Sequence, residues 1–155
     1  MLGRITVTHT FTTTATPTAV WAALEAAPRW PEVLTDLVSA RIEPDGVLAE
    51  GAIIRTAAKP GTRAVDKTYR VTAADPRLHL AIESQADAFR ARTDYAIASF
   101  VSGARVTVTS EVEPVWWLHR ITTELARRAY TKQFEAIMEA RMRPMLTLAE
   151  RIQQA

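Results

Sequence analysis

Seven short segments of strand character followed by one long helical segment constrain this fold more than any other feature of the sequence. Each strand-like segment alternates apolar and polar residues or ends at Pro, Gly or Asp turn residues. The segments cover about residues 4–13, 38–42, 51–58, 66–74, 77–84, 89–101 and 104–113. Short links between successive strands favour antiparallel pairing. We therefore expect an α+β fold whose sheet has six or seven antiparallel strands.

Two short helices interrupt this series after the first strand. Thr16 and Pro17 are residue types preferred at the N-cap and the first position of a helix, which predicts a helix over about 17–26. Pro28 ends this helix, and residues 29–34 follow as a second helical turn or a loop. The predicted order is one strand, two short helices, six strands and one long helix.

The long segment from about 118 to 153 has helical periodicity. We expect Phe134, Ile137 and Leu148 to pack on the sheet, because they fall near one apolar stripe. Pro144 lies inside this pattern and should kink or divide the helix. Only this segment is long enough to cover an apolar sheet face. A twisted sheet wrapped around a single helix leaves space between the two, so we expect a cavity there.

Composition excludes several classes of protein. A chain of 155 residues, 48% of them hydrophobic, can form one domain with a substantial core, which we place at 1–155. The absence of Cys excludes a disulfide framework, a thiolate zinc site and a Cys nucleophile. The five glycines are too far apart for a phosphate-binding loop, and the three histidines lack metal-binding spacing. We therefore expect neither a cofactor nor a metal.

Charge and hydropathy restrict the partners and the location. A net charge of +2 is weak evidence for a nucleic-acid partner. The carboxylate of Glu124 among Arg120, Arg127, Arg128 and Lys132 favours a solvated, salt-bridged helix face. No apolar run resembles a signal peptide or a membrane span of about 18 residues. We expect a cytoplasmic protein, monomeric or homodimeric, without integral membrane association.

Three segments of the sequence, taken in order, form a recognisable pattern. They are ITVTHTFTTTATPTAVWAALEAAPRWPEVL, then ARIEPDGVLAEG, then SGARVTVTSEVEP before the long helix. Pro17, Val20 and Trp21, with the pair Trp30 and Pro31, are the most distinctive residues. With them the chain resembles the START-like, helix-grip superfamily, often called SRPBCC, and within it the bacterial polyketide cyclase/dehydrase-like members. The resemblance implies a helix-grip fold with an apolar cavity that binds lipids, sterols, polyketides or other aromatic molecules.

The candidate ligand-binding residues are those that alternation places on the inner face of the sheet, with one residue near the entrance. They are Tyr95, Tyr69, Phe11, Leu80, Ile97 and Arg55, with Val38 as a further wall residue and Trp30 at the entrance. A Tyr offers an apolar ring and one hydroxyl, which suits a ring-shaped ligand, and a core Tyr bonded to backbone is the alternative. Arg55 faces inward if Ile53 does, and it is a surface charge if Ile54 faces inward.

Three functions are compatible with this pattern. The first is a binding protein for a small hydrophobic ligand that is lipid-like, aromatic or of polyketide type. The alternative is a cofactor-independent aromatase/cyclase or dehydratase, which acts in the same cavity by positioning a reactive chain. The third is a protein-interaction module. Trp116 and Trp117 are adjacent and cannot both face the core, so one of them is expected at the surface. The sequence offers few polar residues that could carry out chemistry, which favours binding over catalysis.

Overall fold

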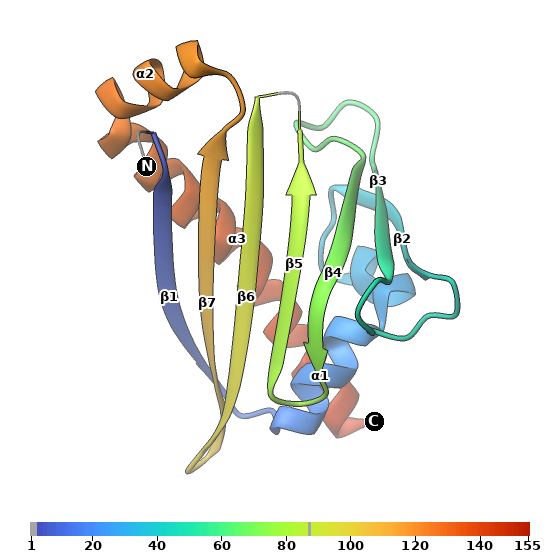
Figure 1. The fold of residues 1–155 in the computed structure, drawn as a ribbon. Coiled ribbons are helices and arrows are strands. Elements are labelled where there is room, and N and C mark those ends of the chain that lie inside the picture. The colour runs from blue at the N-terminus through green and yellow to red at the C-terminus, as the bar shows by residue number, and fades with distance from the viewer. Residues whose placement is uncertain (1–2, 87) are drawn as a thin grey trace.

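The computed structural model describes residues 3–86 and 88–155, and the elements follow the predicted order (Figure 1). The strands are β1 (Ile5–Thr13), β2 (Leu37–Glu43), β3 (Ile53–Ala58), β4 (Lys67–Asp75), β5 (His79–Gln85), β6 (Phe89–Phe100) and β7 (Gly103–Pro114). The helices are α1 (Pro17–Glu25), the 3-10 helix η1 (Ala27–Glu32), α2 (Trp117–Leu125) and α3 (Arg127–Gln154). The predicted α+β class is confirmed.

All seven strands form one antiparallel sheet in the order β1-β7-β6-β5-β4-β3-β2. Neighbours in the sequence pair with each other from β2 to β7, whereas β1 pairs with β7 at the far edge. The sheet is curved, and α3 crosses one of its faces diagonally, which we call the concave face (Figure 1). The predicted wrapping of an antiparallel sheet around a C-terminal helix is confirmed.

The turn between β6 and β7 requires a glycine. Gly103 has φ +156°, and a Cβ added there would lie 1.9 Å from the carbonyl oxygen of Thr13. The hairpin end therefore lies directly against the chain that leaves β1. Three residues after the end of β1, the hydroxyl of Thr16 accepts a hydrogen bond from the N–H of Ala19 at 3.2 Å, and Pro17 starts α1. The predicted N-cap is confirmed, and it places α1 beneath this edge of the sheet.

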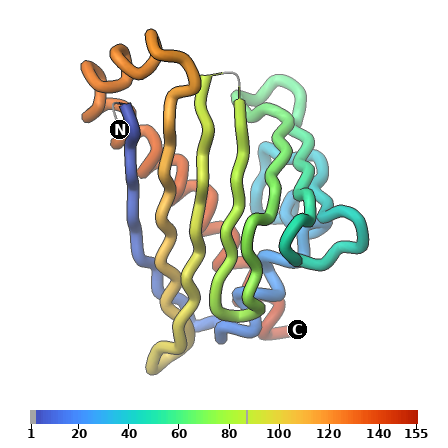
Figure 2. The backbone as a smooth tube through the Cα atoms, viewed as in Figure 1, coloured from blue at the N-terminus to red at the C-terminus, as the bar shows by residue number. Residues whose placement is uncertain are grey.

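The last helical segment is divided, but not where the sequence suggested. We expected Pro144 to kink or divide one helix, whereas α3 continues through it. The break falls at Ala126, whose backbone (φ −106°, ψ 23°) leaves the helical region. Figure 2 shows α2 at one end of the sheet while α3 crosses the concave face. None of the helices in the described ranges is long and apolar enough to cross a membrane.

The core lies between the sheet, to which all seven strands contribute buried residues, and the helices α1 and α3. The apolar stripe of α3 repeats at spacings of three and four, as a packed helix face does. Its buried members are Met138, Met142, Met145, Leu146, Leu148 and Ala149. Leu148 is confirmed as a core residue at 0% exposure, whereas Ile137 is 46% exposed, so the prediction for Ile137 was wrong. Successive residues of an α-helix are rotated by about 100° around the helix axis, so Met138 points toward the core and Ile137 does not.

Candidate functional site

The concave face has a packed half and an open half. In the packed half, residues such as Val7, Phe11, Val106 and Val108 are buried under the helices. Strand register places another group on the same face, because directly paired residues of antiparallel strands point to the same side. This group, which we call the open half, remains partly exposed and consists of Tyr69, Ile82, Ser84, Ala91, Thr93, Tyr95 and Ser110.

The open half stays accessible because α3 does not lie close to it. Among the described elements, α3 runs beside β1, α1 and η1, and it makes no comparable approach to β3, β4, β5 or β6. The first half of α3 contributes two aromatic side chains to this side, Tyr130 and Phe134, both only partly buried. Their ring centroids are 6.2 Å apart, and Phe89 lies 6.0 Å from Tyr130. An aromatic cluster therefore closes one end of the open half.

Two phenol groups lie at the centre of the open half. Tyr95 pairs with Leu80, and Tyr69 pairs with Ile54, so each ring lies beside a buried apolar residue on the neighbouring strand. Burial raises the pKa of Tyr95, and the neighbouring Tyr69 raises it further. Burial also raises the pKa of Tyr69, an effect that the guanidinium of Arg141 partly opposes. Both groups are therefore neutral hydrogen-bond donors at physiological pH.

Neither phenol oxygen has a hydrogen-bond partner within residues 3–86 and 88–155. This finding excludes, for the described residues, the alternative of a core Tyr bonded to a backbone carbonyl. Neither oxygen is among the fully buried side-chain atoms of the described residues that lack a partner, so both keep some access to solvent. The two hydroxyls on one face of the sheet are therefore accessible to a polar atom of a ligand.

The remaining polar groups of this face lie on either side of the tyrosines. The hydroxyls of Thr93 and Ser110 are 2.9 Å apart and hydrogen-bonded to each other. Lys67 precedes Tyr69 by two residues on β4 and so projects from the same face. Partial burial lowers the pKa of its ammonium group, and the positive charge of Arg141 lowers it further. Lys67 and Arg141 therefore lie close to each other on the side of the face next to β3.

Arg141 is held in place by a carboxylate. Its Nη1 and Nη2 donate to the two carboxylate oxygens of Asp36, each at 2.7 Å. The hydrogen bonds from Arg141 hold the pKa of Asp36 below its usual range. This bidentate pair joins α3 to the segment before β2 and fixes the guanidinium beside Tyr69.

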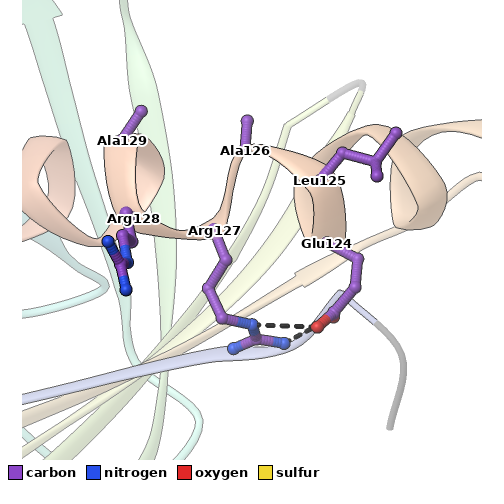
Figure 3. Close-up of a pocket in the computed structure, with 6 residues that line it drawn as sticks. All are labelled: Glu124, Leu125, Ala126, Arg127, Arg128 and Ala129. Carbon is purple, nitrogen blue, oxygen red and sulfur yellow. Dashed lines mark hydrogen bonds and ion pairs between the residues drawn. The ribbon is translucent and has the colours of Figure 1, made fainter.

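Two hollows lie near α2. One has a volume of about 230 Å³ and is lined by Ala88, Phe89, His119, Thr122, Thr123 and Tyr130. The other, about 460 Å³, lies at the α2–α3 junction (Figure 3) and is lined by Glu124, Leu125, Ala126, Arg127, Arg128 and Ala129. Neither contains Tyr69 or Tyr95, so the predicted sheet–helix cavity is not one of these two hollows. The first hollow shares Phe89 and Tyr130 with the aromatic cluster and lies at its entrance.

The structure distributes the sequence-predicted site residues over three places. Tyr69 and Tyr95 lie in the open half. Phe11, Leu80 and Ile97 are 3–4% exposed and belong to the buried layer of the concave face. Trp30 is partly buried against the core on η1, and its indole N–H donates to the carbonyl of Ala23 at 2.9 Å.

Two predicted residues do not reach the concave face. Ile54 is buried and Arg55 is exposed, so Arg55 lies on the convex face, where its Nε donates to Glu43 at 2.7 Å. Val38 was expected to line the cavity but is 55% exposed. A register shift in β2 between Leu37 and Ser39 explains this, because one extra residue turns the side chain to the other face. The alternation rule fails where a strand bulges.

Lys67, Ile82 and Arg141 were not among the residues predicted for the site, although alternation puts Ile82 on the same face as Leu80. The period of two that places Tyr69 inward also places Lys67 inward, so the pattern contained that signal. Arg141 lies seven residues after Phe134, which is two turns along the same helix face. Its pairing with Asp36 bridges 105 positions of sequence, and no local pattern indicates it.

No protein-family model and no curated protein matches this sequence. Solved structures do match. The ZhuI aromatase/cyclase from Streptomyces sp. R1128 aligns with a TM-score of 0.70 at 16% identity, over 96% of this chain and 94% of that chain. The di-domain aromatase/cyclase StfQ of the steffimycin pathway aligns at 0.77 and 12% identity over 98% of this chain, which spans 53% of StfQ. Ara h 8.0201 aligns at 0.68 and 10% identity over 98% of this chain and 99% of that chain.

These similarities extend over nearly the whole chain at identities far too low to transfer an activity. They agree with the observed element order and with the crossing of α3 over one face of the sheet. The chain therefore has the START-like helix-grip fold.

Proposed function

We propose that residues 1–155 form a single domain that binds a small hydrophobic ligand on the open half of the concave face. The observation that carries this proposal is that two partly desolvated phenols, Tyr69 and Tyr95, lie on the open half without a hydrogen-bond partner among the described residues. A ligand with polar atoms that reach these phenols and an apolar body over Ile82 and Phe134 satisfies both kinds of group. The fold supports this function, since the aligned proteins include two aromatase/cyclases.

The charges beside the tyrosines narrow the class of ligand. Lys67 and Arg141 both lie near Tyr69, and only one carboxylate, that of Asp36, engages Arg141. The pKa of Lys67 is lowered by desolvation on burial and then by the positive charge of Arg141, so the two cations lie close enough to repel each other. A carboxylate or enolate oxygen at this end of the ligand compensates their charge. We therefore propose an aromatic or lipid-like molecule with an anionic or strongly polar end.

A cofactor-independent cyclase or dehydratase is the second candidate. Neutral phenols can donate hydrogen bonds to a carbonyl oxygen and so stabilise the enolate that forms during an aldol-type ring closure. The raised pKa values of Tyr69 and Tyr95 favour this donor role and disfavour a role as general base. Under this candidate, Tyr95→Phe abolishes conversion of a poly-β-ketone substrate while the variant still binds it.

Binding is tested with 1-anilinonaphthalene-8-sulfonate, a fluorescent aromatic anion that fits the proposed ligand class. Ala91 and Ala96 both lie on β6, Ala91 in the open half and Ala96 exposed on the opposite face. Ala91→Trp places a large ring in the open half beside Ser84 and Thr93, so we expect at least a tenfold loss of probe affinity. Ala96→Trp is the matched control and should leave the affinity unchanged.

Equal affinity in both variants, or no probe binding by the unmodified protein, contradicts the proposal. Native mass spectrometry of protein purified without denaturation then identifies the ligand class, since a retained molecule appears as a fixed mass increment. We expect that increment to disappear in Ala91→Trp and to persist in Ala96→Trp.

A further inference from the structure

The short helix α2 exposes a continuous apolar surface. Trp117, Leu118, Ile121 and Leu125 are 67%, 58%, 45% and 86% exposed. Their spacing places them on one side of a helix. Trp116 precedes them and is 61% exposed, so both members of the tryptophan pair reach the surface, where the sequence predicted one. We call these five residues the α2 patch.

The α2 patch lies in a positively charged region. Residues 115–134 contain four cations, at Arg120, Arg127, Arg128 and Lys132, and one carboxylate, at Glu124, so the segment has a net charge of +3. Glu124 is already engaged, since it accepts from Nη2 of Arg127 at 2.6 Å and from the N–H of Gly3 at 3.0 Å. The whole chain has a net charge of +2, so the positive charge is concentrated at this end.

The side chains around the α2–α3 junction separate by type. Figure 3 shows Leu125, Ala126 and Ala129 on the side opposite Glu124 and Arg127. Arg128 and Lys132 are exposed, and neither forms an ion pair with another described residue. Apolar side chains and uncompensated cations thus lie next to each other on the outer surface.

A second copy of this chain is a poor complement to such a surface. A two-fold contact through the α2 patch would bring the cations of one copy close to those of the other. An anionic lipid bilayer complements both features, because indole rings prefer the headgroup region and cations pair with phosphate and carboxylate headgroups. We propose that the α2 patch docks the protein peripherally on a bilayer that contains anionic lipid.

The position of the α2 patch connects docking with the open half. The hollow lined by Phe89, His119 and Tyr130 lies between α2 and the aromatic cluster. His119, Thr122 and Thr123 line this hollow from the side of α2 that faces the sheet, so docking through the other side holds the hollow one helix away from the membrane, close to a supply of hydrophobic ligand. This connection rests on the proposed function, whereas the docking itself does not.

Docking is tested by sedimentation with vesicles of phosphatidylcholine alone and with phosphatidylserine added. We expect the unmodified protein to partition onto the phosphatidylserine vesicles at least tenfold more strongly, and to be released by salt. Trp117→Ser with Leu125→Ser should reduce this binding at least tenfold. The matched control is Leu78→Ser with Val101→Ser, because these residues are 58% and 100% exposed at the opposite end of the sheet. Arg128→Gln with Lys132→Gln should remove the preference for phosphatidylserine.

Failure of docking and failure of ligand binding are distinguishable. The probe titration is performed without vesicles, and we expect the Trp117 and Leu125 variant to bind 1-anilinonaphthalene-8-sulfonate as the unmodified protein does. Docking is refuted if the unmodified protein ignores both kinds of vesicle, or if the control variant loses as much binding as the α2 variant. It is also refuted if sedimentation velocity shows a dimer that the α2 variant abolishes, while the unmodified protein does not bind vesicles.

Discussion

The two halves of α3 belong to one continuous helix and yet have different roles. From Met138 onward, α3 presents Met138, Met142, Met145 and Leu148 to the core, and all four are buried. Before Met138, α3 has no buried residue in the described structure, and its Tyr130 and Phe134 are only partly covered. Among the described elements, α1 and β1 pack closely against α3, whereas β3, β4, β5 and β6 make no comparable contact with it. One half of the concave face thus stabilises the fold, and the other is left for a ligand.

The largest effect is expected where the packing is complete. Leu148→Ala removes a side chain that is 0% exposed, which should lower the free energy of unfolding by ~2–5 kcal/mol. Ile137→Ala is the matched control on the same helix, since Ile137 is 46% exposed and should cost about 0.5 kcal/mol or less. Urea denaturation measures both. Equal costs at the two positions would remove the distinction between a packed and an exposed face of α3.

Phe134 tests the open half directly. A fully buried Phe loses about 3–5 kcal/mol when cut to Ala, and Phe134 is only partly buried, so Phe134→Ala should cost ~1.5–2.5 kcal/mol. The same variant should weaken binding of 1-anilinonaphthalene-8-sulfonate, because the ring lies beside the space proposed for the ligand. A loss of stability as large as that of a fully buried Phe, with unchanged probe binding, would place Phe134 in the core.

A smaller effect on binding is expected at the centre of the open half. Tyr95→Phe keeps the ring and removes the hydroxyl, so it separates packing from hydrogen bonding. Affinity for the probe should fall by ~0.5–1.5 kcal/mol while the stability of the free protein hardly changes. Fluorescence titration and urea denaturation of the same preparation provide both values. Lower stability with unchanged affinity would mean that the hydroxyl serves the fold, and Tyr95 would leave the site.

The smallest effect is expected at the ion pair between Arg141 on α3 and Asp36, which precedes β2. Arg141 lowers the pKa of Asp36 in the folded protein below its unfolded value of ~3.9. The pair therefore stabilises the fold above that unfolded value, and its contribution is lost as the pH falls through the lower folded value. Both side chains are partly exposed, at 32% and 42%, so Asp36→Asn should cost ~1 kcal/mol or less at pH 7.

The pH dependence separates this pair from ordinary packing. The difference in stability between Asp36→Asn and the unmodified protein should shrink as the pH is lowered below about 4, where the unmodified carboxyl also becomes neutral. Urea denaturation at a series of pH values measures it. A constant difference across that range would assign the effect of the substitution to shape and not to charge.

Local patterns predicted most of the fold. Alternation located all seven strands, the Thr16 and Pro17 pair located α1, and the change to helical periodicity located the final helices. These features depend on residues close together in the chain, where backbone preferences and one-sided burial act directly. The break at Ala126 was missed because Ala is a strong helix former and carries no stop signal.

The candidate site was predictable only in part. Alternation placed Tyr69 and Tyr95 on the correct face, since their strands are regular. It placed Val38 on the wrong face because β2 bulges beside it, and it left Arg55 undecided until the burial of Ile54 settled the orientation of β3. Alternation alone does not say which of the two sets of side chains in a strand faces the core. Pairing with a neighbouring strand determines that orientation.

The sequence by itself determined which residues share a strand, which segment forms the long helix, and that the two tyrosines face inward. The tertiary structure alone decided that the helix covers one half of the sheet and leaves the other accessible. It also decided that Arg141 lies beside Tyr69 and that the surface of α2 remains uncovered. These outcomes depend on how far apart whole elements pack. That distance is set by side chains from α1, α3 and the sheet together, which no local segment of the chain contains.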